Sequence, residues 1–284
     1  RLRPPRSLVR HERNARADLK DMPPPMQDAC DEEPAYDRVP GRPVSGPAAA
    51  PLIFLCDHAS NAVPARYGDL GLGPEQFARH IAWDIGAGEL TRRLAASFGA
   101  PAFLGRWSRL LVDLNRGADD PTIVMRLSDG AIVPGNAGAD EDEIAARIAR
   151  YHRPYHAAVA AAIEASLAAG TPPTLVSVHS FTPVWKGAPR PWHVAILWDR
   201  DPRLAAPLLE AFRAEEGFTV GDNEPYHGAL EGDTMWTHGT ARGLPHALIE
   251  VRQDLIADEA GIARMTGIVT RALSRALAQA GLPG

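Results

Sequence analysis

Four groups of polar residues follow short apolar runs, at points where buried strands are expected to end. They are residues 57–61 (Asp-His-Ala-Ser-Asn), 113–116 (Asp-Leu-Asn-Arg), 179–181 (His-Ser-Phe) and 250–254 (Glu-Val-Arg-Gln-Asp). In α/β proteins, functional side chains gather beyond the carboxyl ends of the strands. These four groups are therefore the first candidates for a site.

The residue types in these groups suit a metal-dependent hydrolase. His58 and His179 are candidate zinc ligands, because a catalytic zinc takes three protein ligands, often imidazoles, and one water molecule. The metal lowers the pKa of that water and polarises a carbonyl group. Glu250 and Arg116 are the candidate catalytic residues: the carboxylate moves the proton of water to a leaving nitrogen, and the guanidinium binds a substrate carboxylate.

Simpler interpretations of the same residues stay open at this point. A histidine at the end of a strand is often only a polar residue, and Asn115 and Arg116 also fit a surface turn. Glu250 and Arg252 also fit a structural ion pair at a sheet edge. Only a fold that brings the distant groups together would favour the hydrolase.

The elements that must position these groups alternate along the chain. Strands are expected at 52–56, 109–114, 175–178, 193–197, 218–220 and 247–251; helices are expected at 75–98, 141–169 (broken at Pro154), 202–216 and 258–280. This alternation predicts an α/β fold in which helices flank a central, parallel or mixed β-sheet. We expect one domain over residues 51–284, preceded by a disordered leader over residues 1–50, which is rich in Arg, Pro and acidic residues.

Composition excludes several classes of partner. The net charge of -5 provides no basic surface for nucleic acid, and no apolar stretch approaches the length of a membrane span. The two cysteines, Cys30 and Cys56, do not form a disulfide framework, so we expect a cytoplasmic protein. A small-molecule substrate is then the expected partner.

Several blocks of the sequence resemble the N-formylglutamate amidohydrolase family. They are residues 56–64 (Cys-Asp-His-Ala-Ser-Asn-Ala-Val-Pro), 80–87 (His-Ile-Ala-Trp-Asp-Ile-Gly-Ala), 113–116, 178–181, 242–245 (Arg-Gly-Leu-Pro) and 249–254. The likeness covers roughly residues 50–280 in order. That family is similar to the zinc carboxypeptidases and to the aspartoacylase and succinylglutamate desuccinylase group.

The resemblance implies a zinc-carboxypeptidase-like (phosphorylase/hydrolase-like) fold, with a mixed eight-stranded sheet and one zinc ion at the strand ends. It also implies that His58 and His179 hold the metal, that Asn115 and Arg116 bind the substrate carboxylate, and that Glu250 is the general base. One position departs from the pattern of the relatives, because Asn61 stands where an acidic ligand is expected. We expect Asp84 to be the third ligand and Asn61 to orient His58 or contact substrate; the alternative for Asp84 is a helix cap or an arginine pair.

The activity implied is hydrolysis of N-formyl-L-glutamate or a similar N-acyl amino acid, which releases formate or another carboxylate and the free amino acid. Such a reaction belongs to amino-acid catabolism, for example histidine degradation. Arg109 and His238 are further candidates for substrate binding, Arg109 as a second positive charge for a dicarboxylate. Two alternatives remain: a deacylase or small peptidase for another N-acyl amino acid, and a non-catalytic binding domain with the same fold.

Overall fold

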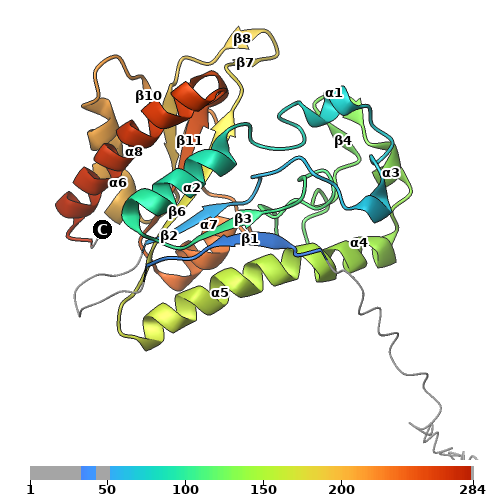
Figure 1. Cartoon of the computed structure of the whole chain (residues 1–284), viewed down its shortest axis with the longest axis horizontal. Coiled ribbons are helices and arrows are strands. Elements are labelled where there is room, and N and C mark those ends of the chain that lie inside the picture. Colours follow the sequence, from blue (N-terminus) through green and yellow to red (C-terminus); the bar gives the residue numbers. More distant parts are fainter. Residues whose placement is uncertain (1–32, 43–51, 283–284) are drawn as a thin grey trace, which may run out of the picture. The chain divides into compact units, whose positions relative to one another are not determined.

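A seven-stranded sheet forms the centre of the structure, a computed structural model that describes residues 33–42 and 52–282 (Figure 1). The strands lie in the order β1–β3–β2–β6–β11–β9–β10. Their bounds are Tyr36–Val39 (β1), Leu52–Cys56 (β2), Ala102–Gly105 (β3), Thr174–Phe181 (β6), Val194–Leu197 (β9), Val220–Asp222 (β10) and His246–Arg252 (β11). The predicted α/β class is confirmed, with seven strands in the described sheet where the family resemblance implied eight.

The four neighbouring strands at the centre of the sheet are parallel, in the order β3–β2–β6–β11. β2 pairs with β6, and β6 pairs with β11, each in parallel register, whereas β1 and β9 run antiparallel to their partners β3 and β11. The carboxyl ends of β2, β6 and β11 therefore lie at one edge of the sheet, and the polar residues that follow them are brought together.

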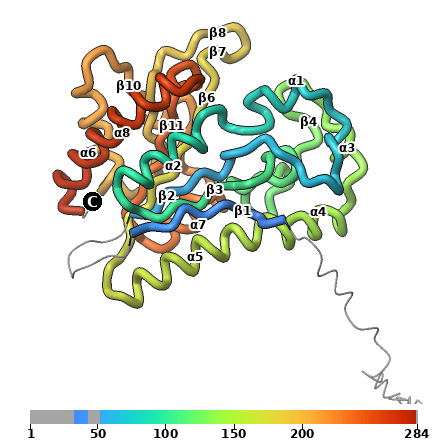
Figure 2. Tube along the Cα trace, viewed as in Figure 1, coloured from blue at the N-terminus to red at the C-terminus, as the bar shows by residue number. Residues whose placement is uncertain are grey.

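Side chains that alternate along β2 pack on opposite faces of the sheet. Phe54 and Cys56 belong to a core formed with three helices, α2 (Ala87–Phe98), α6 (Pro202–Arg213) and α8 (Glu259–Ala280). Ile53 and Leu55 face the other side, where α5 (Arg153–Ala168) and α7 (Thr234–His238) pack. Figure 2 shows these two helical layers on either side of the sheet.

A third apolar cluster lies beyond the sheet, where Ile81, Trp107, Leu110 and Tyr151 pack together. The short elements in the connecting segments are α1 (Pro74–Phe77), α3 (Pro134–Ala137), α4 (Glu141–Arg147), the hairpin of β4 (Leu127–Ser128) and β5 (Ala131–Ile132), and the hairpin of β7 (Val184–Trp185) and β8 (Ala188–Pro189). Both hairpins are separate from the central sheet.

The expected strand at 109–114 is wrong, because this segment forms turns instead. The backbone N–H of Leu111 donates to the carbonyl of Ser108, and that of Asp113 donates to Ile123. Leu110, Leu111 and Val112 are buried in the third cluster, so their apolar run reflects burial in a loop and not sheet pairing.

The expected helix at 75–98 is in fact two helices, α1 and α2, with turns between them. Gly86 begins α2 with a φ of 79°, and a Cβ atom at this position would collide with the carbonyl oxygen of Ile256. The turn before α2 brings the backbone N–H of Asp84 to the carbonyl of His58 at 2.9 Å, which places Asp84 beside the end of β2.

The predicted break at Pro154 is also wrong. α4, a π-helical turn over residues 148–152 and α5 follow one another without interruption, and Pro154 lies in the first turn of α5. A proline is tolerated there because its missing N–H falls where the π turn already changes the hydrogen-bond pattern.

The expected leader reaches too far, because residues 36–39 form β1 and pair with β3 at the sheet edge. The compact unit accordingly spans Pro34–Gly284. Residues 1–32 and 43–50 of that predicted leader lie outside the described residues.

The other predicted strands and the helices at 202–216 and 258–280 match observed elements to within a few residues. In the part of the chain that the structure describes, no helix is both long and apolar enough to cross a membrane.

Candidate active site

The parallel strands carry the predicted residues to a common place. Asp57 and His58 directly follow β2, His179 lies near the end of β6, and Glu250 lies opposite His179 in the register of β11. Their positions are thus fixed by the backbone hydrogen bonds of three adjacent strands. Residues from three distant parts of the sequence meet here, which the simpler interpretation as unrelated surface residues does not explain.

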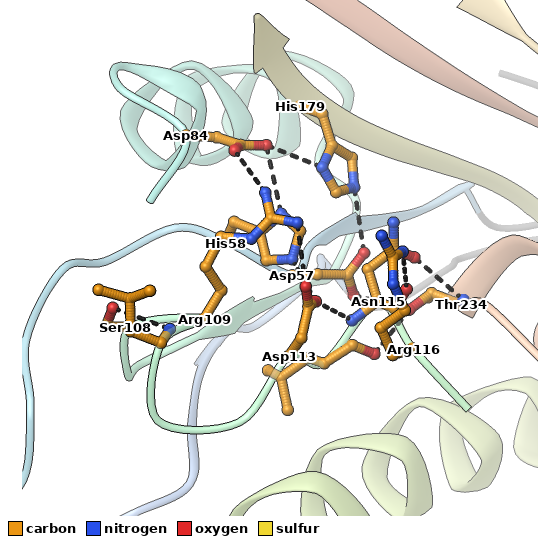
Figure 3. Close-up of polar contacts among 12 residues, drawn as sticks. Asp57, His58, Asp84, Ser108, Arg109, Asp113, Asn115, Arg116, His179 and Thr234 are labelled. Atoms are coloured by element: carbon orange, nitrogen blue, oxygen red, sulfur yellow. Dashed lines mark hydrogen bonds and ion pairs between the residues drawn. The ribbon is translucent and has the colours of Figure 1, made fainter. Parts of the chain in front are cut away.

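His58, Asp84 and His179 form a buried cluster in which one ligand atom from each lies within 4.8 Å of the others. The Nδ1 atom of His179 is 2.8 Å from Asp84 Oδ2, and the Nδ1 atom of His58 is 3.4 Å from the same oxygen (Figure 3). The site thus brings together the three residues that were predicted as metal ligands.

A second carboxylate contacts the far nitrogen of each imidazole. Asp113 Oδ1 lies 2.7 Å from His58 Nε2, and Asp57 Oδ2 lies 3.1 Å from His179 Nε2. Each Nε2 faces a carboxylate and donates its proton to it, so a metal ion would be bound through Nδ1, in place of the contact that His179 Nδ1 makes with Asp84. The Nδ1 atom of His58 is buried and makes no hydrogen bond. This arrangement, with an aspartate behind each ligand histidine, is typical of zinc sites.

The charges of the cluster also fit a cation. Asp57, Asp84 and Asp113 are all buried, with one guanidinium, that of Arg109, beside them. Burial by itself would raise the pKa of Asp57, but the hydrogen bond and charge of His179 lower it to about 2. The pKa of Asp84 is likewise held well below its usual range, against burial, by His58 and His179. A divalent cation would balance this excess of carboxylate.

Arg109 is already engaged by two of these aspartates. Its Nη2 atom donates to Asp113 Oδ2 at 2.9 Å, and its Nη1 atom lies 3.5 Å from Asp84 Oδ1. Its Nε atom is buried and has no partner. Arg109 thus lies beside the cluster of His58, Asp84 and His179 and lines the pocket, with its charge shared between two aspartates.

Asn115 and Arg116 lie at the side of the cluster in a loop that is held from several directions. Asp113 Oδ1 accepts the backbone N–H of Asn115 at 2.9 Å, and Asn115 Oδ1 accepts that of Thr234 at 3.1 Å. The amide NH₂ of Asn115 is therefore the part that remains to donate to a ligand. Among the residues that the structure describes, the guanidinium of Arg116 donates to the carbonyl of Asn115 alone and lies 3.9 Å from Asp120, so it remains able to bind a carboxylate.

Glu250 is a buried carboxyl group with an unpaired oxygen. It is 6% exposed, its Oε2 atom has no hydrogen-bond partner, and it lines the pocket beside the cluster. Burial raises its pKa to about 7. A carboxyl group with such a pKa exchanges protons readily near neutral pH, as general base catalysis requires.

Two residues predicted to contact substrate lie elsewhere. Asn61 donates its amide to the carbonyl of Phe77 and does not line the pocket. His238 is buried behind the Asn115–Arg116 loop, where its Nε2 atom lies 2.9 Å from His156 Nδ1. Both predictions relied on the presence of a polar residue near a motif. The sequence does not distinguish a polar residue that contacts substrate from one that bonds to the backbone or to another histidine.

The structure adds residues that sequence reasoning did not assign. Asp57 and Asp113 lie in blocks that the sequence analysis singled out, and the structure adds their contacts with His179 and His58. Thr234 and Asp233, at the start of α7, had no signal in the sequence beyond a pattern typical of a helix cap. The pocket beside these residues has a volume of about 340 Å³, and its lining includes His58, Asp84, Arg109, Asn115, Arg116, His179, Asp233 and Glu250.

Comparison with known proteins identifies the family. The family model for N-formylglutamate amidohydrolase matches residues 50–257. The chain belongs to the N-formylglutamate amidohydrolase family. It is therefore an amidohydrolase, an enzyme that hydrolyses amide C–N bonds.

Two solved structures are similar to this chain over most of their length. The gene product Atu2144 of Agrobacterium tumefaciens is 34% identical, with a TM-score of 0.81, and the alignment covers 87% of this chain and 96% of that one. An N-formylglutamate amidohydrolase from Ralstonia eutropha JMP134 is 21% identical, with a TM-score of 0.63 and coverage of 87% and 99%. No curated protein matches the chain.

Proposed function

We propose that this amidohydrolase uses one zinc ion to hydrolyse N-acyl amino acids, with N-formyl-L-glutamate as the first substrate to test. The observation that carries the proposal is the buried cluster of His58, Asp84 and His179, in which the Nδ1 atom of His58 has no hydrogen-bond partner. His58 and His179 would hold the zinc together with Asp84, while Asp113 and Asp57 keep the imidazoles in the correct tautomer. A zinc ion bound there supplies Lewis acidity toward the amide carbonyl and lowers the pKa of water.

The side chains around the cluster have roles that follow from their positions. Arg116 and the amide of Asn115 bind the α-carboxylate of the amino acid, which places the amide bond near Glu250. Glu250 accepts a proton from the attacking water molecule while the oxygen of that water forms a bond to the acyl carbon. It then passes this proton to the amide nitrogen as the C–N bond breaks, so that a carboxylate and a free amino acid leave. The free Nε–H of Arg109 stabilises negative charge that develops on the carbonyl oxygen.

Elemental analysis together with a substrate panel tests the proposal. We expect about one zinc ion per chain, and its loss when His58 and His179 are both replaced by Ala. We also expect hydrolysis of at least one compound among N-formyl, N-acetyl and N-succinyl amino acids, and the acyl group preferred separates a formyl hydrolase from other deacylases. Intact folding without either metal or turnover would favour a binding domain. A place in cytoplasmic amino-acid breakdown, such as histidine degradation, belongs to the proposal if N-formyl-L-glutamate is the preferred substrate.

A further inference from the structure

The side chain of Arg190, directly after the β7–β8 hairpin, is a buried guanidinium group. Arg190 is 8% exposed. Among the residues that the structure describes, its side chain donates to neutral groups and to no carboxylate: the carbonyl and hydroxyl of Thr182 and the hydroxyl of Tyr226. A buried charge without an opposite charge nearby is strongly destabilising. Arg190 is therefore a candidate for binding an anion that enters the pocket beside it.

Three aromatic rings surround this guanidinium. Its Cζ atom lies 5.8 Å from the ring centroid of Phe181, 5.3 Å from that of Trp185 and 5.1 Å from that of Tyr226. The faces of aromatic rings attract a cation and hold it in place, but they do not neutralise its charge. All three aromatic residues line the pocket. Arg190 therefore lies directly behind this wall of the pocket.

Two hydroxyl groups connect Arg190 to the pocket. Thr182 Oγ1 accepts from Nη1 of Arg190 at 3.2 Å, and the hydroxyl oxygen of Tyr226 accepts from Nη2 at 3.1 Å. Both residues line the pocket. A hydroxyl that accepts a hydrogen bond still has its own proton to donate. Two O–H donors held by one planar guanidinium suit the two oxygen atoms of a carboxylate.

The electrostatic surroundings of Tyr226 place it near the reaction centre. Burial is the largest cause that raises the pKa of Tyr226, and the charges of Glu250 and Asp84 raise it further, while the hydrogen bond from Arg190 lowers it. The phenol therefore keeps its proton as a donor. It also lies within electrostatic reach of the proposed base and of a proposed metal ligand.

The two guanidinium groups that line the pocket are already engaged. Arg109 shares its charge between two aspartates. Arg116 binds the α-carboxylate in the proposed function. Its charge also lowers the pKa of Asp233, which burial raises to about 6. A second carboxylate on the substrate thus requires a further cation, and Arg190 is the one without an acidic partner.

Among the histidines that line the pocket outside the metal cluster, His227 is the rival donor. His80 Nε2 lies 3.6 Å from Asp129, and His246 has both ring nitrogens engaged by other groups. The Nδ1 atom of His227 accepts the backbone N–H of Ala229, which leaves its Nε2 atom to donate. A test of the second carboxylate site must therefore separate Arg190 from His227.

We propose that Arg190, acting with the hydroxyl groups of Thr182 and Tyr226, forms a second carboxylate-binding subsite, which takes the side-chain carboxylate of an acidic N-acyl amino acid. This inference rests on the proposed function and deepens it, since Arg116 takes the α-carboxylate. The two hydroxyls donate to the carboxylate oxygens, and the guanidinium behind them supplies the opposite charge. A side-chain amide has nearly the same shape but no charge, so the subsite favours the acid over the amide.

The test compares N-formyl-L-glutamate with N-formyl-L-glutamine at pH 8 with the zinc-loaded enzyme. We expect kcat/KM to be at least about tenfold higher for the glutamate compound, because hydrogen bonds to a charged group are the stronger ones. In Arg190→Gln, the ratio of the two kcat/KM values should fall by about tenfold or more. Tyr226→Phe keeps the ring beside Arg190 and loses only the hydroxyl, so the ratio should fall there too. Circular dichroism and zinc content would verify that each variant is folded.

Lys186→Gln is the matched control. Lys186 also lies over the ring of Trp185, with Nζ 5.8 Å from its centroid, but it is exposed and lies outside the pocket lining. Its replacement should leave the substrate ratio close to that of the wild type. Calorimetric titration with L-glutamate adds a measurement that needs no turnover. The affinity should weaken by about tenfold or more in Arg190→Gln.

Equal or slower hydrolysis of the glutamate compound by the wild type would overturn the inference, as would an unchanged ratio in Arg190→Gln. A ratio that is lost in His227→Gln and kept in Arg190→Gln would assign the carboxylate to His227 and overturn it as well. Lack of turnover of the whole N-acyl panel, with zinc bound, would overturn the proposed function. The subsite would then be decided by L-glutamate binding, which Arg190→Gln must weaken.

Discussion

The hydroxyl of Thr234 lies 3.0 Å from Asp57 Oδ1, and the backbone N–H of the same residue donates to Asn115 Oδ1 at 3.1 Å. Asp57 contacts His179 through its other oxygen, and Asn115 belongs to the proposed carboxylate site. The first residue of α7 therefore connects the orientation of a metal ligand to the position of the residue that binds substrate. Figure 3 shows Thr234 beside both groups.

Replacement of Thr234 by Val should weaken zinc binding and catalysis together. Valine has nearly the same shape but cannot donate to Asp57, and loss of such a supporting hydrogen bond costs about 10–100-fold in metal affinity or activity. Thr234→Ser keeps the hydroxyl and should remain close to wild type. Chelator competition gives the zinc affinity, and steady-state kinetics gives kcat and KM. A Val variant with wild-type zinc affinity would contradict this coupling.

Replacement of Glu250 by Gln should preserve zinc and remove most turnover. The amide fills the same space but cannot accept a proton, and general base catalysis contributes typically about 10²–10⁴-fold to rate. The measurement is kcat together with zinc content by elemental analysis. Near-normal kcat in a zinc-replete variant would show that another group is the base.

Replacement of Asp113 by Asn should lower zinc affinity more than the same replacement of an exposed aspartate does. Asp113 accepts from His58 and from the backbone of Asn115 through one oxygen, and it pairs with Arg109 through the other. The amide nitrogen of Asn cannot accept, so at least one of these contacts is lost and a buried donor is left unpaired, at a cost of about 1–3 kcal/mol. Asp119→Asn, at an exposed position of the same loop, is the control. Comparable zinc affinity in the two variants would contradict the role of Asp113.

Acid should destabilise the protein through histidines that support the Asn115–Arg116 loop. His156 Nε2 donates to the carbonyl of Leu114, so its Nδ1 must accept from His238 Nε2. Burial lowers the pKa of His156 to about 4 and that of His238 to about 3, from about 6.5 in the unfolded chain. The unfolded state binds more protons between these values, so the free energy of unfolding should be unaffected by this pair above pH 6.5 and fall as pH drops toward 4.

Urea unfolding at pH 7.5 and at pH 5.0 measures that loss. His238→Gln should show a smaller loss between the two values than the wild type, because one buried titrating group is gone. His227→Gln, at an exposed histidine, should behave as the wild type does. An equal loss in all three proteins would assign the acid sensitivity to other groups.

The sequence allowed much of the site to be predicted because strand ends are easy to recognise. His58, His179 and Glu250 follow or end short apolar runs, and parallel pairing then brings them together. The segment at 109–114 misled the prediction because an apolar run buried in turns has the same composition as a strand. The contacts of Arg109 and His238 could not be predicted, since a sequence shows that a side chain is charged or polar but not which nearby group it meets.

The two hairpins, β4–β5 and β7–β8, contribute Asp129 and Trp185 to the pocket without joining the central sheet. The proposed metal ligands and general base, in contrast, lie in or beside the strands and turns around β2, β6 and β11. Changes in hairpin length or sequence can therefore remodel the pocket entrance while the catalytic groups keep their geometry. Exchange of these hairpins between relatives offers a direct way to engineer amidohydrolases with new substrates from a constant catalytic core.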